Sequence, residues 1–318
     1  MSMSSAISIP HPRKQGVGWR SVMISRPARL RRAHFSLAIE QDDTAFVPFE
    51  DIAVIVLNHR EITLTHPVLS ACAEYGISLF ATGEDHQPNG IFLPFLQHSR
   101  STRLWRLQQA ASRPLVKQLW AALIRTKIDN QTVVLRRYNK DGAEALESLA
   151  RRVRSGDPER LESQAAARYF AALFGPSFSR EFSGFANAAL NYGYAVLRGV
   201  IARSLVAHGL HPSIGLFHDS EQNAFNLADD LIEPFRPLVD LWVAHTITTA
   251  SRDELMPPDK AALVGLLNTD VRMPRGDMAA LTAIEQSVES LVRALETDTA
   301  EALELPVLLG LRAHPADG

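Results

Sequence analysis

The spacing of apolar residues changes near Ser99, and this change constrains the fold more than any other feature of the sequence. Before it, large apolar residues occupy every second position of residues 35–40, which is typical of a strand with one buried face. Residues 51–57 form a continuous apolar, β-branched run bounded by charge and by Asn58, which indicates a buried strand. After Ser99 the spacing becomes three and four, which indicates helices.

Local signals subdivide the first part of the chain. Pro67 can open a helix that runs to Tyr75 and ends before Gly76, because proline needs no N–H partner in a first helical turn. A further strand is expected over residues 77–81. The Gln-Pro-Asn-Gly sequence of residues 87–90 predicts a turn.

The second part is predicted to be helical throughout. Helices are expected to begin near residues 99, 158, 184, 223 and 278, and Gly209 has the position of a capping glycine after the third of them. Pro257 and Pro258 are expected to break the chain. The patterns together predict an α+β protein. It has a small β-rich domain at residues 1–98, a larger all-α domain with the catalytic candidates at 99–310 and a tail at 311–318.

Length and composition restrict the class of protein. At 318 residues the chain exceeds the usual size of one compact core, which favours two domains. No apolar run is long enough to span a bilayer, and the polar N-terminal segment lacks the apolar core of a secretory signal. The single cysteine, Cys72, excludes an internal disulfide and a cysteine-based zinc site. We therefore expect a cytoplasmic protein.

Charge is distributed unevenly along the chain. Residues 1–160 hold 22 Lys and Arg against 15 Asp and Glu, whereas residues 161–318 hold 11 against 20. This asymmetry suits a protein that binds phosphates with one surface and cations with another, although charge alone favours the alternative of an ordinary solvated surface. Basic residues also recur at spacings of three on the first helix of the second part and form a stripe there; they are Arg100, Arg103 and Arg106.

Two residues are candidates for metal chemistry. Glu162 shares a helix face with Tyr169 and Leu173, where an unpaired charge would be costly to bury. His218 lies in a loop before a helix, and imidazole is a common metal ligand. For each residue taken alone, the alternative is structural: an arginine partner for Glu162 and a surface position for His218.

A pair of acidic residues and a polar stripe follow. Asp230 and Glu233 are three apart, so their carboxylates project the same way and repel unless a cation or proton lies between them. A divalent metal ion or Arg236 resolves the repulsion, and a solvated acidic turn is the alternative. The stripe crosses the long helix from 184, and it can orient metal ligands, bind phosphates or hold helices together. Its residues are Asn187, Asn191, Tyr194 and Arg198.

The order of these motifs resembles the CRISPR-associated Cas1 family, the integrases that insert new spacers into CRISPR arrays. The resemblance spans nearly the whole chain and is densest over residues 187–194, 211–218 and 227–240. Glu162 with the Ala-Ala and Tyr-Phe that follow fits the family's first acidic motif, and residues 127–131 resemble its Lys-x-x-Asn-Gln segment. The compact size and Glu233 are similar to the versions from type II systems.

The resemblance implies a catalytic metal site and a defined reaction. Glu162, His218 and Glu233 are expected to bind Mg²⁺ or Mn²⁺, with Asp230, Asn187, Asn191 and Arg236 in support. The implied reaction is attack of a DNA 3′-hydroxyl on a phosphodiester of the CRISPR repeat, or cleavage where water attacks instead. His218 is an alternative general acid or base.

The resemblance also implies macromolecular partners. A homodimer, formed through the N-terminal domain, is expected to assemble with the small Cas2 protein across a double-stranded prespacer. The candidates for DNA contact are Arg100, Arg103, Arg106 and Lys127.

Two other functions fit individual motifs. The pair His218 and Asp219 suggests a metal phosphohydrolase of the His-Asp type, which needs further histidines, and His208 and His211 are the nearest ones upstream. The other alternative is a non-catalytic DNA-binding scaffold in which the acidic residues are structural.

Overall fold

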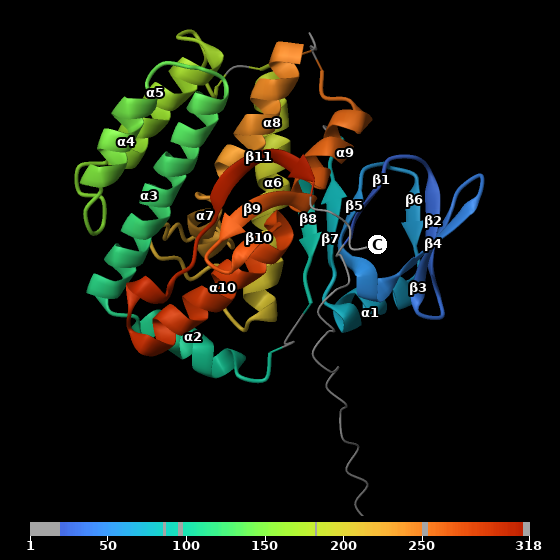
Figure 1. Ribbon diagram of the computed structural model, residues 1–318. Helices are drawn as coiled ribbons and strands as arrows, with labels where there is room; N and C mark the ends of the chain where they lie inside the picture. Colours follow the sequence, from blue (N-terminus) through green and yellow to red (C-terminus); the bar gives the residue numbers. More distant parts are fainter. Residues whose placement is uncertain (1–19, 85–86, 95–97, 182, 250–253, 314–318) are drawn as a thin grey trace, which may run out of the picture.

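The computed structural model describes residues 20–84, 87–94, 98–181, 183–249 and 254–313. A β-rich part and a mostly helical part lie side by side, and helix α6 runs through the middle of the second (Figure 1). The polar N-terminal segment discussed above lies outside the described residues. Within the described ranges, we find no helix that is both long and apolar enough to cross a membrane.

Two four-stranded sheets form the β-rich part, with the orders β4-β3-β2-β6 and β1-β5-β7-β8. The strands are β1 (Arg20–Ile24), β2 (Ala28–Ala33), β3 (Ser36–Glu40), β4 (Thr44–Pro48), β5 (Ile52–Leu57), β6 (Ile62–Leu64), β7 (Ser78–Thr82) and β8 (Pro88–Phe92), with helix α1 (His66–Tyr75) between β6 and β7 and the short 3-10 helix η1 (Phe49–Asp51) before β5. The strands predicted at 35–40, 51–57 and 77–81 are confirmed, as is the helix through Tyr75. Gly76 ends it with a left-handed φ of 68°.

Strand β5 shows why its sequence is apolar without interruption. Ile52 and Ile55 pack in the core of the β-rich part, whereas Val54 and Val56 pack in the core of the helical part. The sheet that contains β5 is therefore shared by both cores, and burial on both faces leaves no position for a polar residue.

The predicted turn at residues 87–90 is wrong, because Pro88–Phe92 form strand β8. Gly90 pairs with Ala81 of β7, and β8 is the last strand of its sheet. Proline is tolerated as the first residue of an edge strand, where its missing N–H removes no necessary ladder bond. Tertiary pairing with β7 thus overrides the turn composition.

Most of the second part is helical, as expected. The helices are α2 (Ser101–Ala110), α3 (Arg113–Arg137), α4 (Ala143–Arg152), α5 (Leu161–Phe174), α6 (Phe185–Ala207), α7 (Asn226–Leu231), α8 (Arg236–Thr249), α9 (Pro257–Gly265) and α10 (Ala280–Thr297), with short 3-10 helices at Leu266–Asn268 and Ala300–Ala302. Gly209 follows α6 with φ of 79°, the left-handed conformation expected of a capping glycine. Pro257 begins α9 instead of breaking the chain, because proline suits a first helical turn.

The prediction of an all-α second domain is wrong in one respect. A three-stranded sheet of order β10-β9-β11 lies there, formed by β9 (Thr269–Met273), β10 (Gly276–Ala279) and β11 (Val307–Ala313). Strand β11 extends past the start of the expected tail, and residues 314–318 lie outside the described ranges. The fold is α+β, with a β-rich N-terminal part and a mostly helical C-terminal part.

Candidate active site

Two of the predicted metal ligands, Glu162 and Glu233, meet at one cation, the ammonium group of Lys127. Lys127 lies in the second half of α3, Glu162 in the first turn of α5, and Glu233 between α7 and α8. The Lys127 Nζ atom is 2.5 Å from Glu233 Oε2 and is also paired with Glu162 Oε1. The side chains of Lys127 and Glu233 are each 8% exposed, against 27% for Glu162, so the cluster is buried and opens on the Glu162 side.

The electrostatics of the cluster favour the ionised forms. Burial raises the pKa of Glu233, but the positive charges of Lys127 and Arg236 outweigh it and lower that pKa to about 2. Burial lowers the pKa of Lys127, but the charges of Glu233 and Glu162 outweigh it, so this pKa lies above its usual value. Arg236 Nε lies 2.8 Å from Glu233 Oε1, and the Arg236 guanidinium stacks 4.6 Å from the Tyr194 ring centroid. Two carboxylates are thus balanced by two cations.

The start of α5 determines where Glu162 lies. The predicted start near residue 158 is three residues early, because Asp157 caps the helix from outside: its carboxylate accepts the backbone N–H groups of Leu161 and Glu162 at 2.9 and 3.0 Å. Glu162 therefore stands in the first turn, where the helix dipole favours a negative charge. Tyr169 and Leu173 are buried on α5, as the predicted helical phase requires.

His218 is held by Asp230. The His218 Nδ1 atom lies 2.7 Å from Asp230 Oδ1, and the Asp230 side chain is fully buried, whereas that of His218 is 40% exposed. Asp230 also accepts the backbone N–H groups of Leu216, Phe217 and His218. A carboxylate that holds Nδ1 leaves Nε2 as the nitrogen available to a ligand or substrate, an arrangement common around metal-binding histidines.

The surroundings of His218 affect its protonation. The hydrogen bond to Asp230 raises the pKa of His218, burial lowers it, and the charges of Asp230 and Glu233 raise it further, so that it lies above its usual value. Glu233 is therefore near enough to His218 to influence the pKa of the imidazole.

Three further residues shape the loop of His218. A Cβ atom on Gly215 would lie 2.1 Å from the His218 carbonyl oxygen, so the turn requires glycine. Gln108 of α2 accepts the His211 N–H at 2.8 Å and donates to the His211 carbonyl oxygen at 3.2 Å. Trp120 of α3 stacks on Phe217, with ring centroids 4.2 Å apart. Sequence reasoning missed Gln108 and Trp120. The spacing of seven between Trp120 and Lys127 places both on one face of α3 and could have pointed to Trp120, whereas no such spacing points to Gln108.

The polar stripe of α6 supports neighbouring loops. Arg180 donates to Asn187 at 2.7 Å and to Asn191 at 2.6 Å. Arg198 pairs with Asp229 at 2.8 Å, and the Tyr194 hydroxyl donates to Asp240. The stripe thereby connects α6 to the loop before it, to α7 and to α8.

The predicted DNA contacts have different surroundings. Arg100, Arg103 and Arg106 are exposed at and along α2, opposite its buried residues, and Arg103 is 3.2 Å from Glu296. Lys127 is buried with the two carboxylates. Whether these four residues contact DNA stays a prediction.

The donor set fits a hard divalent cation. Among the residues that the structure describes, no three His, Cys, Asp or Glu side chains form a ready-made metal cluster, since Glu162 and Glu233 face Lys127 and His218 faces Asp230. Two carboxylates that converge on one cation, together with an imidazole held through Nδ1 by Asp230, nevertheless offer the oxygen and nitrogen ligands that suit Mg²⁺ and Mn²⁺.

The histidines required by a His-Asp phosphohydrolase have other partners. The His208 Nδ1 atom lies 2.9 Å from the Ser204 carbonyl oxygen, and the His211 Nδ1 atom lies 2.8 Å from Ser213 Oγ. Neither histidine forms part of a metal cluster with His218 and Asp219 within the described ranges. The structure therefore gives this alternative no support.

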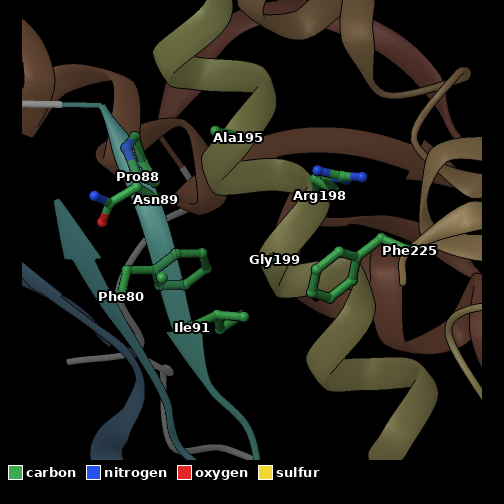
Figure 2. A pocket seen from close by; sticks show the side chains of 9 residues that line it. Phe80, Pro88, Asn89, Ile91, Ala195, Arg198, Gly199 and Phe225 are labelled. Carbon is green, nitrogen blue, oxygen red and sulfur yellow. The ribbon is translucent and has the colours of Figure 1, made fainter. Parts of the chain in front are cut away.

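A cavity of about 200 Å³ lies between α6 and the strands β7 and β8 (Figure 2). Phe80 and Ile91 line it from the sheet, and Arg198, Gly199 and Phe225 line it from the other side. Its lining includes none of the three predicted ligands, so it is separate from the carboxylate pair.

The chain is similar to known proteins of one family. The family model described as CRISPR associated protein Cas1 matches residues 22–256. The chain is 43% identical over 299 residues to the CRISPR-associated endonuclease Cas1 of Neisseria meningitidis serogroup C, covering 93% of this chain and 98% of that protein.

Solved structures share the fold. A casposase bound to integration product has a TM-score of 0.70 at 19% identity, covering 88% of this chain and 91% of that one. A chain of a Cas6-RT-Cas1–Cas2 complex has a TM-score of 0.71 at 17% identity, covering 94% of this chain and 37% of that one.

Proposed function

This chain belongs to the CRISPR-associated Cas1 family, and on that premise we propose that it is a divalent-metal-dependent DNA integrase and endonuclease of CRISPR adaptation. Its metal ligands would be Glu162, His218 and Glu233. The observation that carries the proposal is the convergence of Glu162 and Glu233 on a single buried cation. The name of the Neisseria relative supports the nuclease activity, and the integration product bound by the casposase supports strand transfer.

The proposed reaction needs these residue types. When bound, Mg²⁺ or Mn²⁺ would supply Lewis-acid stabilisation of the phosphate and acidify the attacking hydroxyl. Glu162 and Glu233 offer hard oxygen ligands, and Asp230 orients His218 so that Nε2 is presented as the third. The competing role for His218 is to accept or donate a proton at Nε2.

Strand transfer leaves the number of phosphodiester bonds unchanged. The 3′-oxygen of the incoming DNA forms a bond to the phosphorus of the repeat, and the bond to the departing 3′-oxygen breaks, so no nucleotide is hydrolysed. If water attacks in place of the 3′-hydroxyl, the same site cleaves DNA and the protein acts as a nuclease.

The proposal includes partners. We expect double-stranded DNA as substrate, contacted by the exposed arginines Arg100, Arg103 and Arg106, and a homodimer formed through the β-rich part. The structural similarity to a chain of a Cas6-RT-Cas1–Cas2 complex supports assembly with a Cas2 protein, and we expect the assembly in the prokaryotic cytoplasm.

Substitution of Glu162 tests the reaction. In Glu162→Gln the oxygen ligand loses its charge, so joining of a 3′-hydroxyl duplex to a repeat-containing plasmid should fall on the order of a hundredfold or more. Binding of the duplex, measured by gel shift, should be retained. Glu144→Gln is the matched control, because Glu144 is an exposed acid in the first turn of α4.

Metal removal tests the cofactor independently. Joining should stop in EDTA and return when Mn²⁺ or Mg²⁺ is added in excess. Joining that persists in EDTA would exclude the metal site. Wild-type protein that binds the duplex but never joins it, with or without Cas2, would favour the scaffold alternative.

A further inference from the structure

The side chain that holds Glu162 and Glu233 together is itself a cation, and we propose that Lys127 is a built-in competitor of the divalent metal ion. Its ammonium group occupies the carboxylate pair in the metal-free protein and leaves it when the metal binds. The inference rests on the proposed function, because it takes the two carboxylates as metal ligands.

Specific oxygen atoms are involved. Lys127 Nζ contacts Glu162 Oε1 and Glu233 Oε2. The remaining oxygens have other partners: Ser163 Oγ lies 3.2 Å from Glu162 Oε2, and Arg236 Nε lies 2.8 Å from Glu233 Oε1. The oxygens that would be free to bind a metal are thus the two that Lys127 occupies.

Charge balance explains why the metal and the ammonium group cannot share the pair. Glu162 and Glu233 carry two negative charges, and Lys127 and Arg236 carry two positive charges. A divalent ion added to these four groups would leave excess positive charge in a buried site, which is costly. Departure of one resident cation reduces the excess.

Lys127 is the resident cation able to leave. Its ammonium group sits on a flexible four-carbon stem, whereas Arg236 has a planar guanidinium stacked over the Tyr194 ring. Arg236 also belongs to the same turn as Glu233, three residues away. Arg236 can therefore keep Glu233 in place while Lys127 moves.

Lys127 has two expected effects as a positioning residue. Without metal, it prevents the repulsion of two buried carboxylates and keeps them together. With metal, it lowers the apparent affinity, because the ion must displace it.

Removal of the Lys127 charge tests the competition. Lys127→Met keeps the length of the side chain without the cation, so the Mn²⁺ dissociation constant should decrease on the order of tenfold. The constant is measured from the electron paramagnetic resonance signal of free Mn²⁺. Lys117→Met is the matched control on the same helix, because Lys117 is exposed, and its Mn²⁺ affinity should equal that of the wild type. Unchanged or weaker Mn²⁺ binding in Lys127→Met would overturn the inference.

A second substitution separates this inference from the proposed function. Glu162→Gln, alone and combined with Lys127→Met, should weaken Mn²⁺ binding in both backgrounds. If binding depends on Glu162 but Lys127→Met leaves the affinity unchanged, only the competition is refuted. If Glu162→Gln leaves Mn²⁺ binding unchanged both in the wild-type background and in Lys127→Met, the proposed metal site is refuted. The proposed competition is then refuted as well.

Labelling of the wild-type protein supplies a measurement that does not depend on a variant folding. Without metal, Lys127 is buried and paired, so an amine-reactive reagent should modify it slowly. Saturating Mn²⁺ should increase its modification, measured by mass spectrometry, at least severalfold, while the modification of Lys117 stays constant. Labelling of Lys127 that is unchanged or decreased by Mn²⁺ would overturn the inference.

Discussion

Asp240 of α8 is a fully buried carboxylate next to the site, and it connects the site to the stability of the protein. It accepts a hydrogen bond from the Tyr194 hydroxyl, and the Arg236 guanidinium stacks over the Tyr194 ring. Burial raises the pKa of Asp240 to about 6, although the hydrogen bond from Tyr194 and the charge of Arg236 act in the opposite direction. At neutral pH the protein therefore holds a buried charge that burial disfavours.

Substitution of Asp240 should stabilise the protein at neutral pH. The pKa of Asp240 is higher in the folded protein than in the unfolded chain. Protonation of Asp240 therefore contributes fully to the free energy of unfolding below about pH 4. This contribution is lost between about pH 4 and pH 6, and it is absent at higher pH. Asp240→Asn keeps an acceptor for Tyr194 without the charge. It should raise the free energy of unfolding by about 1–3 kcal/mol at pH 7 and change it little at pH 4. Urea unfolding at both pH values measures this, and an equal change at both would contradict it.

The sequence identified the candidate ligands better than their partners. Glu162, His218 and Glu233 stand in motifs whose order along the chain is specific, and a helix-face argument placed Asp230 beside them. The place of Lys127 could not be predicted in this way, since its partners are 35 and 106 residues away in the sequence. Because several arginines lie near Lys127 in the sequence, the sequence pattern indicated that Lys127 belongs to an exposed basic surface.

The start of α5 is the element on which the site depends most directly. Asp157 caps it with two accepted N–H groups and has a left-handed φ of 47°, a conformation that aspartate and asparagine adopt more readily than alanine. Asp157→Ala should therefore lower the free energy of unfolding by about 1–3 kcal/mol, through the lost cap and the unfavourable φ together.

The matched variant separates the two causes. Asp157→Asn tolerates the left-handed conformation and keeps one acceptor oxygen, so it should lose about half as much stability. Urea unfolding measures both variants. If Asp157→Ala unfolds at the same urea concentration as the wild type, the cap does not hold the helix start.

Elements with strong local patterns were predicted from the sequence, and elements that depend on distant partners were not. The helix from 184 to 208 differs by one residue at each end from α6, because its apolar period is long and Gly209 ends it. The sheet β10-β9-β11 was missed, because β11 pairs with a strand more than 30 residues earlier and its two companions are only four and five residues long. Strand β8 was missed because its composition is that of a turn.

At the scale of the whole molecule, the β-rich and helical parts are joined along α6. Arg203 of α6 is buried, donates to the Gly76 carbonyl oxygen at 2.6 Å and pairs with Glu285 of α10 at 2.6 Å. One turn earlier, Gly199 packs directly against Phe80 of β7, beside the cavity in Figure 2. No local pattern in the sequence indicates this contact, because a glycine within a helix has no periodic signature.

The close approach at Gly199 yields a prediction for the whole fold. A Cβ atom there would lie 2.0 Å from two carbon atoms of the Phe80 ring, so Gly199→Ala must force the sheet and the helix apart or distort the ring. The overpacking should lower the free energy of unfolding by about 1–3 kcal/mol, even though alanine favours a helix over glycine. Gly265→Ala is the control, because a Cβ there meets nothing within 4 Å, and it should leave stability unchanged or slightly raised.

A second substitution shows whether the effect comes from this contact. Phe80→Leu removes the ring that the new methyl group would strike, so Gly199→Ala should cost much less stability in that background than in the wild type, giving a coupling energy of about 1 kcal/mol or more. Urea unfolding of the two single variants and the double variant measures the coupling. If the losses of stability in the two single variants are additive in the double variant, the packing of α6 against the sheet does not depend on the contact of Gly199 with Phe80. Coupled losses would mean that the strain of Gly199→Ala arises at the Phe80 ring, where α6 meets the sheet.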